Sequence, residues 1–137
     1  MLYVFPPGTS ATVIADYARP YPDPIRVRAG EAVVPDAERT RATDFLGWTW
    51  CTGPDGRCGW VPNAWMRADA DGVMRMIRDF AALEHDVRRG DRAILHFSES
   101  GFVFASVRGE AAWIPDAVLE LDGGRTGAGE SSVRRGG

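Results

Sequence analysis

The side chains that first suggest a chemical site are two cysteines, Cys51 and Cys58, and two histidines, His85 and His96. Thiolate and imidazole groups hold zinc when pairs of them recur at short spacings. Here six residues separate the two cysteines, no second cysteine pair exists, and neither histidine stands at a zinc-finger spacing. The sequence therefore predicts no metal site and no other cofactor.

The two cysteines flank residues 53–56, Gly-Pro-Asp-Gly, a sequence typical of a type I turn. With Pro54 and Asp55 at the turn centre, Cys51 faces Cys58 across a hairpin, with Cα atoms ~4.5–5.5 Å apart. A disulfide can bridge that separation, whereas a reducing cytoplasm keeps both thiols free. We expect a packed cross-strand pair of free thiols, with a disulfide as the alternative.

Motifs of catalysis and of phosphate binding are missing from the sequence. It contains no G-x-S-x-G, no P-loop and no G-x-G-x-x-G. The net charge of -3 and the pI near 5.3 disfavour nucleic-acid binding, which requires a basic face. We therefore predict a protein that is not an enzyme and does not bind nucleic acid.

The ends of the chain and its apolar runs bear on its location. No apolar stretch approaches the ~18 residues of a membrane span, and the first ten residues lack the features of a signal peptide. We expect a cytoplasmic protein without a membrane partner. All 16 basic residues are arginine, which we interpret as the codon bias of a GC-rich bacterial genome. Residues 122–137 are rich in Gly, Ser and charge, and we expect a disordered tail there.

The elements that must position the aromatic and thiol groups are short β-strands. Runs of β-branched and aromatic residues alternate with turn signals every eight to twelve positions. Residues 72–82 alternate apolar and charged side chains, a pattern that by itself fits a strand or a helix.

Four sequence blocks recur in the same order, which indicates an internal repeat. Residues 15–18, 27–34, 47–51 and 59–65 match residues 78–81, 87–95, 101–105 and 112–118. The separations are 63, 60, 54 and 53 residues, so length changes fall only between blocks. This pattern predicts two tandem β-units. The linker at residues 67–71 is too short for free tumbling, so we expect a fixed mutual orientation.

These blocks, "ADYA", "VRAGEAVV", "GWTWC" and "GWVPNAW", resemble those of the SH3 domain. Residues 13–66 resemble a full copy and residues 73–120 a degenerate one. The resemblance implies an all-β protein of two tandem SH3-like five-stranded, partly open barrels packed against each other. We place an N-terminal arm at residues 1–10, the first domain at 11–67 and the second, degenerate domain at 72–121.

Strand alternation separates the aromatic side chains from the core. Trp48 and Trp50 share one face of their strand, and Cys51 lies on the other. In the SH3 family the position of Cys51 is a core residue and that of Trp48 lines the ligand groove. The resemblance therefore implies that both indoles face outward. Two exposed indoles on one face call for a ligand or a covering partner.

The same resemblance, with the adjoining proline-rich loop, assigns a ligand site to six residues. They are Tyr17, Tyr21, Asp23, Trp48, Pro62 and Trp65. SH3 grooves hold extended Pro-rich peptides, which lose little entropy on binding. The sequence departs from the family at Ala15 and Ala64, where one groove wall and one hydrogen bond to the peptide are lost.

Two functions lead from these residues, beside a third class, a small-molecule or glycan-binding barrel that would use the same rings for stacking. The first is a non-catalytic protein- or peptide-binding module, with Pro-containing segments as possible ligands. The alternative is a structural or assembly subunit whose aromatic face is buried in a homodimer or partner complex. In the second domain Phe80, Phe102 and Val118 occupy the aromatic positions without a polar handle, and we expect a scaffold.

The N-terminal arm, "LYVFPPG", has no counterpart inside the repeat. Its extended, apolar sequence fits an added edge strand or a flexible arm, which we favour. The alternative is that residues 3–7 lie along the aromatic groove.

Overall fold

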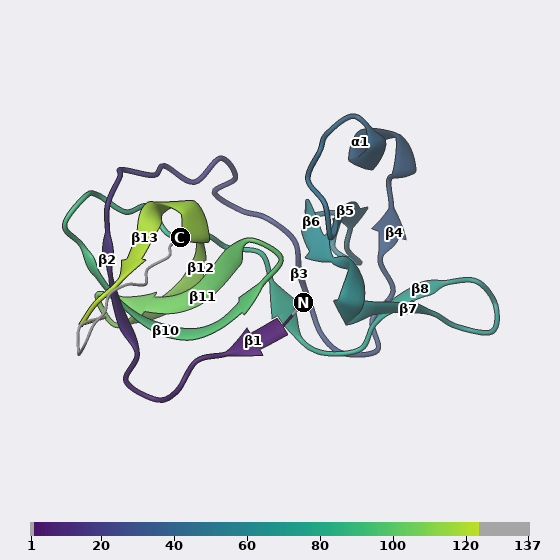
Figure 1. Cartoon of the computed structure of the whole chain (residues 1–137). Coiled ribbons are helices and arrows are strands. Elements are labelled where there is room, and N and C mark those ends of the chain that lie inside the picture. The colour runs from purple at the N-terminus through teal and green to yellow at the C-terminus, as the bar shows by residue number, and fades with distance from the viewer. Residues whose placement is uncertain (1, 124–137) are drawn as a thin grey trace. The chain divides into compact units, whose positions relative to one another are not determined.

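The computed structural model describes residues 2–123, so most of the expected disordered tail, residues 124–137, lies outside the described residues. The described chain is built from short β-strands, with one five-residue α-helix, as the sequence predicts (Figure 1). The strands pair into four separate sheets and not into closed barrels.

The strands form two compact units that do not coincide with the two expected domains. Unit 2 is the continuous segment 21–83, whereas unit 1 combines residues up to 20 with residues from 84 onward. Residues 11–13, expected in the first domain, therefore pair within unit 1. Residues 74–81, expected in the second domain, pair within unit 2.

Unit 1 contains six strands and one 3-10 turn. They are β1 (Leu2–Val4), β2 (Ser10–Val13), β10 (Arg92–Glu99), β11 (Phe102–Val107), β12 (Glu110–Pro115), η2 (Asp116–Val118) and β13 (Leu119–Leu121). The sheet order is β12-β11-β10-β2-β13, and β1 pairs with β10. All its pairings are antiparallel.

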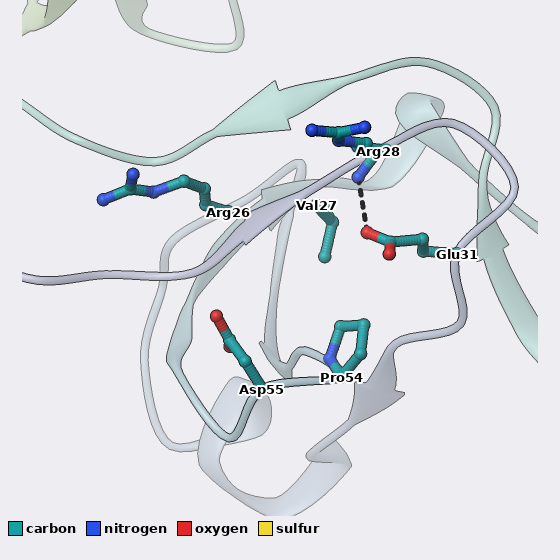
Figure 2. Close-up of a pocket in the computed structure, with 6 residues that line it drawn as sticks. All are labelled: Arg26, Val27, Arg28, Glu31, Pro54 and Asp55. Atoms are coloured by element: carbon teal, nitrogen blue, oxygen red, sulfur yellow. Dashed lines mark hydrogen bonds between the residues drawn. The ribbon is translucent and has the colours of Figure 1, made fainter.

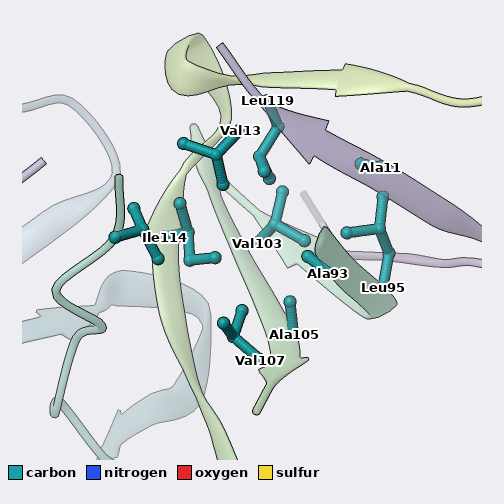
Figure 3. Packing of buried hydrophobic residues seen from close by; sticks show 10 residues of the cluster. Ala11, Val13, Ala93, Leu95, Val103, Ala105, Val107, Ile114 and Leu119 are labelled. Atoms are coloured by element: carbon teal, nitrogen blue, oxygen red, sulfur yellow. The ribbon is translucent and has the colours of Figure 1, made fainter. Parts of the chain in front are cut away.

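The core of unit 1 lies on one face of these strands. Along β11 the buried residues Val103, Ala105 and Val107 alternate with half-buried ones, as expected of a strand with one face in a core. Val13 and Leu119 enter the same cluster from β2 and β13 (Figure 3). Burial of this apolar surface is the main stabilising term for the unit.

The N-terminal arm forms the edge strand that we favoured from the sequence. In β1, Leu2 pairs with Glu99 and Val4 with Phe97. The following residue, Phe5, donates its N–H to the His96 carbonyl at 3.0 Å and packs against the core.

Unit 2 contains the helix and seven strands, with one 3-10 turn. They are β3 (Arg26–Val27), β4 (Val34–Pro35), α1 (Ala37–Arg41), β5 (Trp48–Thr52), β6 (Cys58–Pro62), η1 (Asn63–Trp65), β7 (Met66–Ala68), β8 (Met74–Met76) and β9 (Phe80–Ala81). The sheets are β4-β5-β6, β7-β8 and β3-β9. The ambiguous segment 72–82 thus contains strands and no helix.

The hairpin between β5 and β6 has a different register from the one expected. The Gly53 N–H donates to the Arg57 carbonyl at 2.8 Å, and Gly56 has a φ of 89°. These features define a three-residue loop, in which the last residue takes the left-handed conformation. Cys51 consequently pairs with Gly59, and Cys58 with Thr52.

The expected cross-strand pairing of the cysteines is therefore wrong. Directly opposed residues share a face of the sheet, and neighbours along a strand alternate, so Cys51 and Cys58 lie on opposite faces. Cys51 is buried beside the Met66 sulfur at 3.7 Å, whereas the Cys58 sulfur lies 3.3 Å from the Thr52 hydroxyl.

Candidate functional site

The β5-β6 hairpin separates an aromatic face from the core of unit 2. Trp48 pairs with Pro62 and Trp50 with Trp60, so these four side chains share one face. The opposite face carries Cys51, as strand alternation predicts.

The two indoles of β5 are not exposed, contrary to expectation. Trp48 is 4% exposed and Trp50 is 7% exposed. Phe45, from the segment between α1 and β5, stacks on Trp48 with ring centroids 5.4 Å apart, and meets Trp60 edge-on at 5.1 Å. The aromatic face therefore has its own cover, built from unit 2.

Helix α1 contributes to that cover at Trp50. The Arg39 guanidinium lies 3.8 Å above the centre of the Trp50 ring, and the Tyr21 ring contacts the same indole at 5.3 Å. Thr40 accepts the Trp50 N–H through its hydroxyl at 3.0 Å. The Asp36 carboxylate caps the helix by accepting the Arg39 N–H at 2.9 Å. These bonds fix the helix against β5.

Two of the predicted site residues lie opposite each other at the end of the hairpin, and a third follows in the next turn. Trp48 lies directly opposite Pro62, and Trp65 follows at the end of η1. The Asn63 N–H donates to the Gly47 carbonyl at 2.8 Å, which holds the turn against the start of β5. Trp65 is 4% exposed.

Two residues that were not predicted for this site contact Trp65. The Phe80 ring meets the indole edge-on at 5.4 Å, and the Arg78 guanidinium lies 4.1 Å from the ring centre. Both belong to the block that repeats residues 15–18. The sequence offered one signal for these contacts, the five-residue linker at residues 67–71. A tight connection there keeps the next strand beside β7.

Tyr17, in contrast, lies in unit 1. Its hydroxyl donates to the Glu84 carboxylate, and its backbone exchanges hydrogen bonds with Val87. Burial raises the pKa of the Glu84 carboxyl, although the bond from Tyr17 acts in the opposite direction. Tyr17 therefore does not join Trp48 and Trp65 in one unit.

The remaining predicted residue, Asp23, is engaged in ion pairs within unit 2. Its carboxylate accepts from the Arg57 Nε at 2.9 Å and lies 3.8 Å from the Arg26 guanidinium. A hydrogen bond from the Arg57 backbone N–H lowers the pKa of the Asp55 carboxyl, and the Arg57 side chain, which also contacts Asp55, acts in the same direction. Asp23 is thus already paired with cations of its own chain.

A hollow of about 240 Å³ lies elsewhere in unit 2, beside the β5-β6 loop. Its lining residues are Arg26, Val27, Arg28, Glu31, Pro54 and Asp55 (Figure 2). The Arg28 backbone N–H donates to the Glu31 carboxylate at 2.8 Å (Figure 2). This hollow contains none of the six predicted site residues.

Over residues 2–123, no group of three or more His, Cys, Asp or Glu side chains is arranged to hold a metal ion. The helices in this range are three to five residues long, so none could cross a bilayer.

Comparison with known proteins relates the sequence to one family. Residues 11–69 match the variant SH3 domain family, and the match begins in unit 1 and continues through β7 of unit 2. No curated protein and no solved structure matches the chain. SH3-like domains in general bind proteins or peptides and are not catalysts. Over residues 11–69, less than half of the chain, the sequence is thus similar to the variant SH3 domain family.

Proposed function

We propose that this chain is a protein- or peptide-binding module whose site is the aromatic surface of unit 2 around Trp48, Pro62 and Trp65. The pairing of Trp48 with Pro62, followed by Trp65 in the next turn, carries the proposal. Flat rings and a proline side by side suit an extended, Pro-containing segment, because such a segment is already ordered before it binds.

Tyr21 and Asp23, on the segment that leads into β3, are proposed as the border of this site. Tyr21 contacts Trp50, and Asp23 is held by Arg57. A ligand that binds here must displace Phe45 from Trp48 or use the remaining edge of the surface, since the Trp48 ring is already stacked.

The burial of Trp48 and Trp65 favours a second candidate function, a structural or assembly role. Both side chains are only 4% exposed. In that role the aromatic face stabilises the protein or a complex and has no exchangeable ligand.

A titration of the full chain with a fluorescein-labelled Pro-rich peptide library separates the two functions. Anisotropy and tryptophan fluorescence report binding, and Trp48→Ala tests the site. Loss of one central aromatic contact should weaken binding by about tenfold or more. Phe102→Ala is the matched control, because Phe102 pairs with Pro115 in unit 1 as Trp48 pairs with Pro62 in unit 2.

Saturable binding that Trp48→Ala weakens and Phe102→Ala does not would support the binding module. Circular dichroism and thermal denaturation of each variant establish that it remains folded. An absence of saturable binding by any peptide, together with a stable oligomer, would instead support the assembly role.

A further inference from the structure

We infer that the two repeated segments exchange their first strands within one chain, so that Arg78 and Phe80 complete the proposed site of unit 2 in place of Ala15 and Tyr17. The strand exchange stands on the pairings alone. The assignment of Arg78 and Phe80 to ligand selection rests on the proposed function.

The first observation is the matching register of two strand pairs. In unit 1, Thr12 of β2 lies opposite Glu120 of β13, and in unit 2, Arg75 of β8 lies opposite Arg67 of β7. Thr12 and Arg75 are 63 residues apart, and Arg67 and Glu120 are 53 apart, which are the separations of the first and last repeated blocks. Each first strand therefore pairs with the last strand of the other segment.

The second observation is the same exchange at the next block. Tyr17 bridges to Val87 in unit 1, and the matching residue Phe80 pairs with Val27 in unit 2. Each pair joins the first block of one segment to the second block of the other.

Two matching hydrogen bonds near the block ends follow the same rule. The Asp16 carboxylate accepts the Arg89 N–H at 2.8 Å, and the matching Asp79 carboxylate accepts the Ala29 N–H at 2.9 Å. The exchange is reciprocal at the strands, at the bridges and at these side chains.

The linker supplies a physical cause for the exchange. Between β7 and β8 the Asp69 N–H donates to the Val73 carbonyl at 2.9 Å, and the Asp69 carboxylate accepts the N–H groups of Asp71 and Val73. The connection is a tight hairpin, so β8 takes the place beside β7. The first segment's own strand, β2, is then available to pair with β10 and β13.

The exchange changes the chemistry next to Trp65. At the position where the sequence alone assigns Ala15, unit 2 has Arg78, whose guanidinium lies 4.1 Å from the Trp65 ring centre. A cation beside the aromatic surface favours a ligand carboxylate and disfavours a ligand arginine. The structure therefore assigns to this site an extended peptide with an acidic residue.

Paired cysteines in the full chain test the exchange without any ligand. In a background of Cys51→Ala and Cys58→Ser, the pairs T12C/E120C and R67C/R75C should form disulfides on mild oxidation, because directly opposed Cα atoms lie ~4.5–5.5 Å apart. T12C/R67C and R75C/E120C are the matched controls, since they would be opposed only without exchange. Non-reducing gels and peptide mapping identify the bonds.

Disulfides in monomeric T12C/E120C and R67C/R75C, with none in the controls, would support exchange within one chain. Disulfides in the control pairs would overturn it. A crosslinked dimer of T12C/E120C would show that the strands exchange between two copies, and would also overturn the inference.

A binding experiment tests the assignment of Arg78 and Phe80. The probes are a labelled proline decapeptide and two versions of it that end in glutamate or in arginine. Phe80→Ala should weaken binding about tenfold, whereas its counterpart Tyr17→Ala should leave binding unchanged. Arg78→Gln should remove the preference for glutamate over arginine.

The opposite pattern, with Tyr17→Ala weakening binding and Phe80→Ala without effect, would overturn the assignment while the proposed function stands. An absence of binding by all three probes would count against the proposed function, and the cysteine pairs would still decide the exchange.

Discussion

The Phe45 and Trp48 rings lie parallel, with their planes 2° apart and their centroids 5.4 Å apart. Trp48 occupies the position that lines the ligand groove in the SH3 family, so this stack covers the proposed site with a residue of the same unit. Phe45→Ala should therefore expose the indole, and acrylamide quenching and a red shift of tryptophan emission would report it. Unfolding should also become easier by about 1–3 kcal/mol, less than for a fully buried ring.

Leu46→Ala is the matched control for this experiment. Leu46 is the next residue, is 85% exposed, and should change neither quenching nor stability. Equal quenching in Phe45→Ala and in the parent protein would contradict the covering role of Phe45.

Gly59 lies where a side chain has no room. A Cβ at this position would stand 2.8 Å from Ile25 Cγ2 and 3.2 Å from the Ile25 backbone nitrogen. Gly59→Ala should therefore destabilise unit 2 by about 1–3 kcal/mol through overpacking, as measured by denaturant unfolding. The corresponding position of unit 1 is Ala112, which is buried. Ala112→Gly removes one buried methyl group and adds the conformational freedom of glycine to a strand, and should cost unit 1 about 1–2 kcal/mol without any clash. An unchanged denaturation midpoint for Gly59→Ala would refute the clash.

The two thiols should differ sharply in reactivity. Burial raises the pKa of Cys51 from 9.0 to about 12, so its reactive thiolate is scarce at pH 8. Iodoacetamide should modify Cys58 in the folded protein and leave Cys51 intact until unfolding, with mass spectrometry as the readout.

Stability should fall as pH rises above about 9, since the unfolded chain then releases the Cys51 proton and the folded chain does not. Cys51→Ala should remove that part of the pH dependence.

The Tyr17–Glu84 pair predicts a second pH effect, in unit 1. Because burial raises the pKa of the Glu84 carboxyl above 4.5, protonation favours the folded state. The contribution of Glu84 to stability is therefore largest below the unfolded pKa and declines as pH rises through the folded pKa. Glu84→Gln keeps an acceptor for the Tyr17 hydroxyl without the buried charge.

Thermal denaturation at several pH values checks this prediction. Glu84→Gln should be at least as stable as the parent at pH 7 and should lose that advantage toward pH 4. Tyr17→Phe should be less stable than the parent at pH 7, because it leaves the carboxylate without its donor. An advantage of Glu84→Gln that grows toward pH 4 would contradict the assigned direction.

Local rules of sequence predicted the faces of the strands well. Period-two alternation placed Trp48 and Trp50 opposite Cys51, and the structure has the same arrangement. The partner of Cys51 could not be read in the same way, since it depends on whether the loop has two or three residues. Gly56 in the left-handed conformation makes three, and one residue of shift moves Cys58 to the other face.

The sequence could not predict which strands pair with each other. The first repeated block begins two residues after β2 and two residues after β8, but block order alone does not say which unit each of these strands joins. That choice depends on the hairpin at Asp69, a connection between the two segments and not a property of either. The coverage of Trp48 by Phe45 was missed for a similar reason, because residues 42–47 show no periodic pattern.

Because unit 2 is a continuous segment, the two parts of unit 1 are connected covalently only through residues 21–83. While unit 2 is folded, it acts as a short tether between them. When it unfolds, the same residues become a long flexible loop, and the effective concentration of β2 near β10 and β13 falls with the entropy of loop closure. A single proteolytic cut inside unit 2 would then leave unit 1 as a complex of two fragments, held without a covalent link by strand pairing and core packing and separable by dilution.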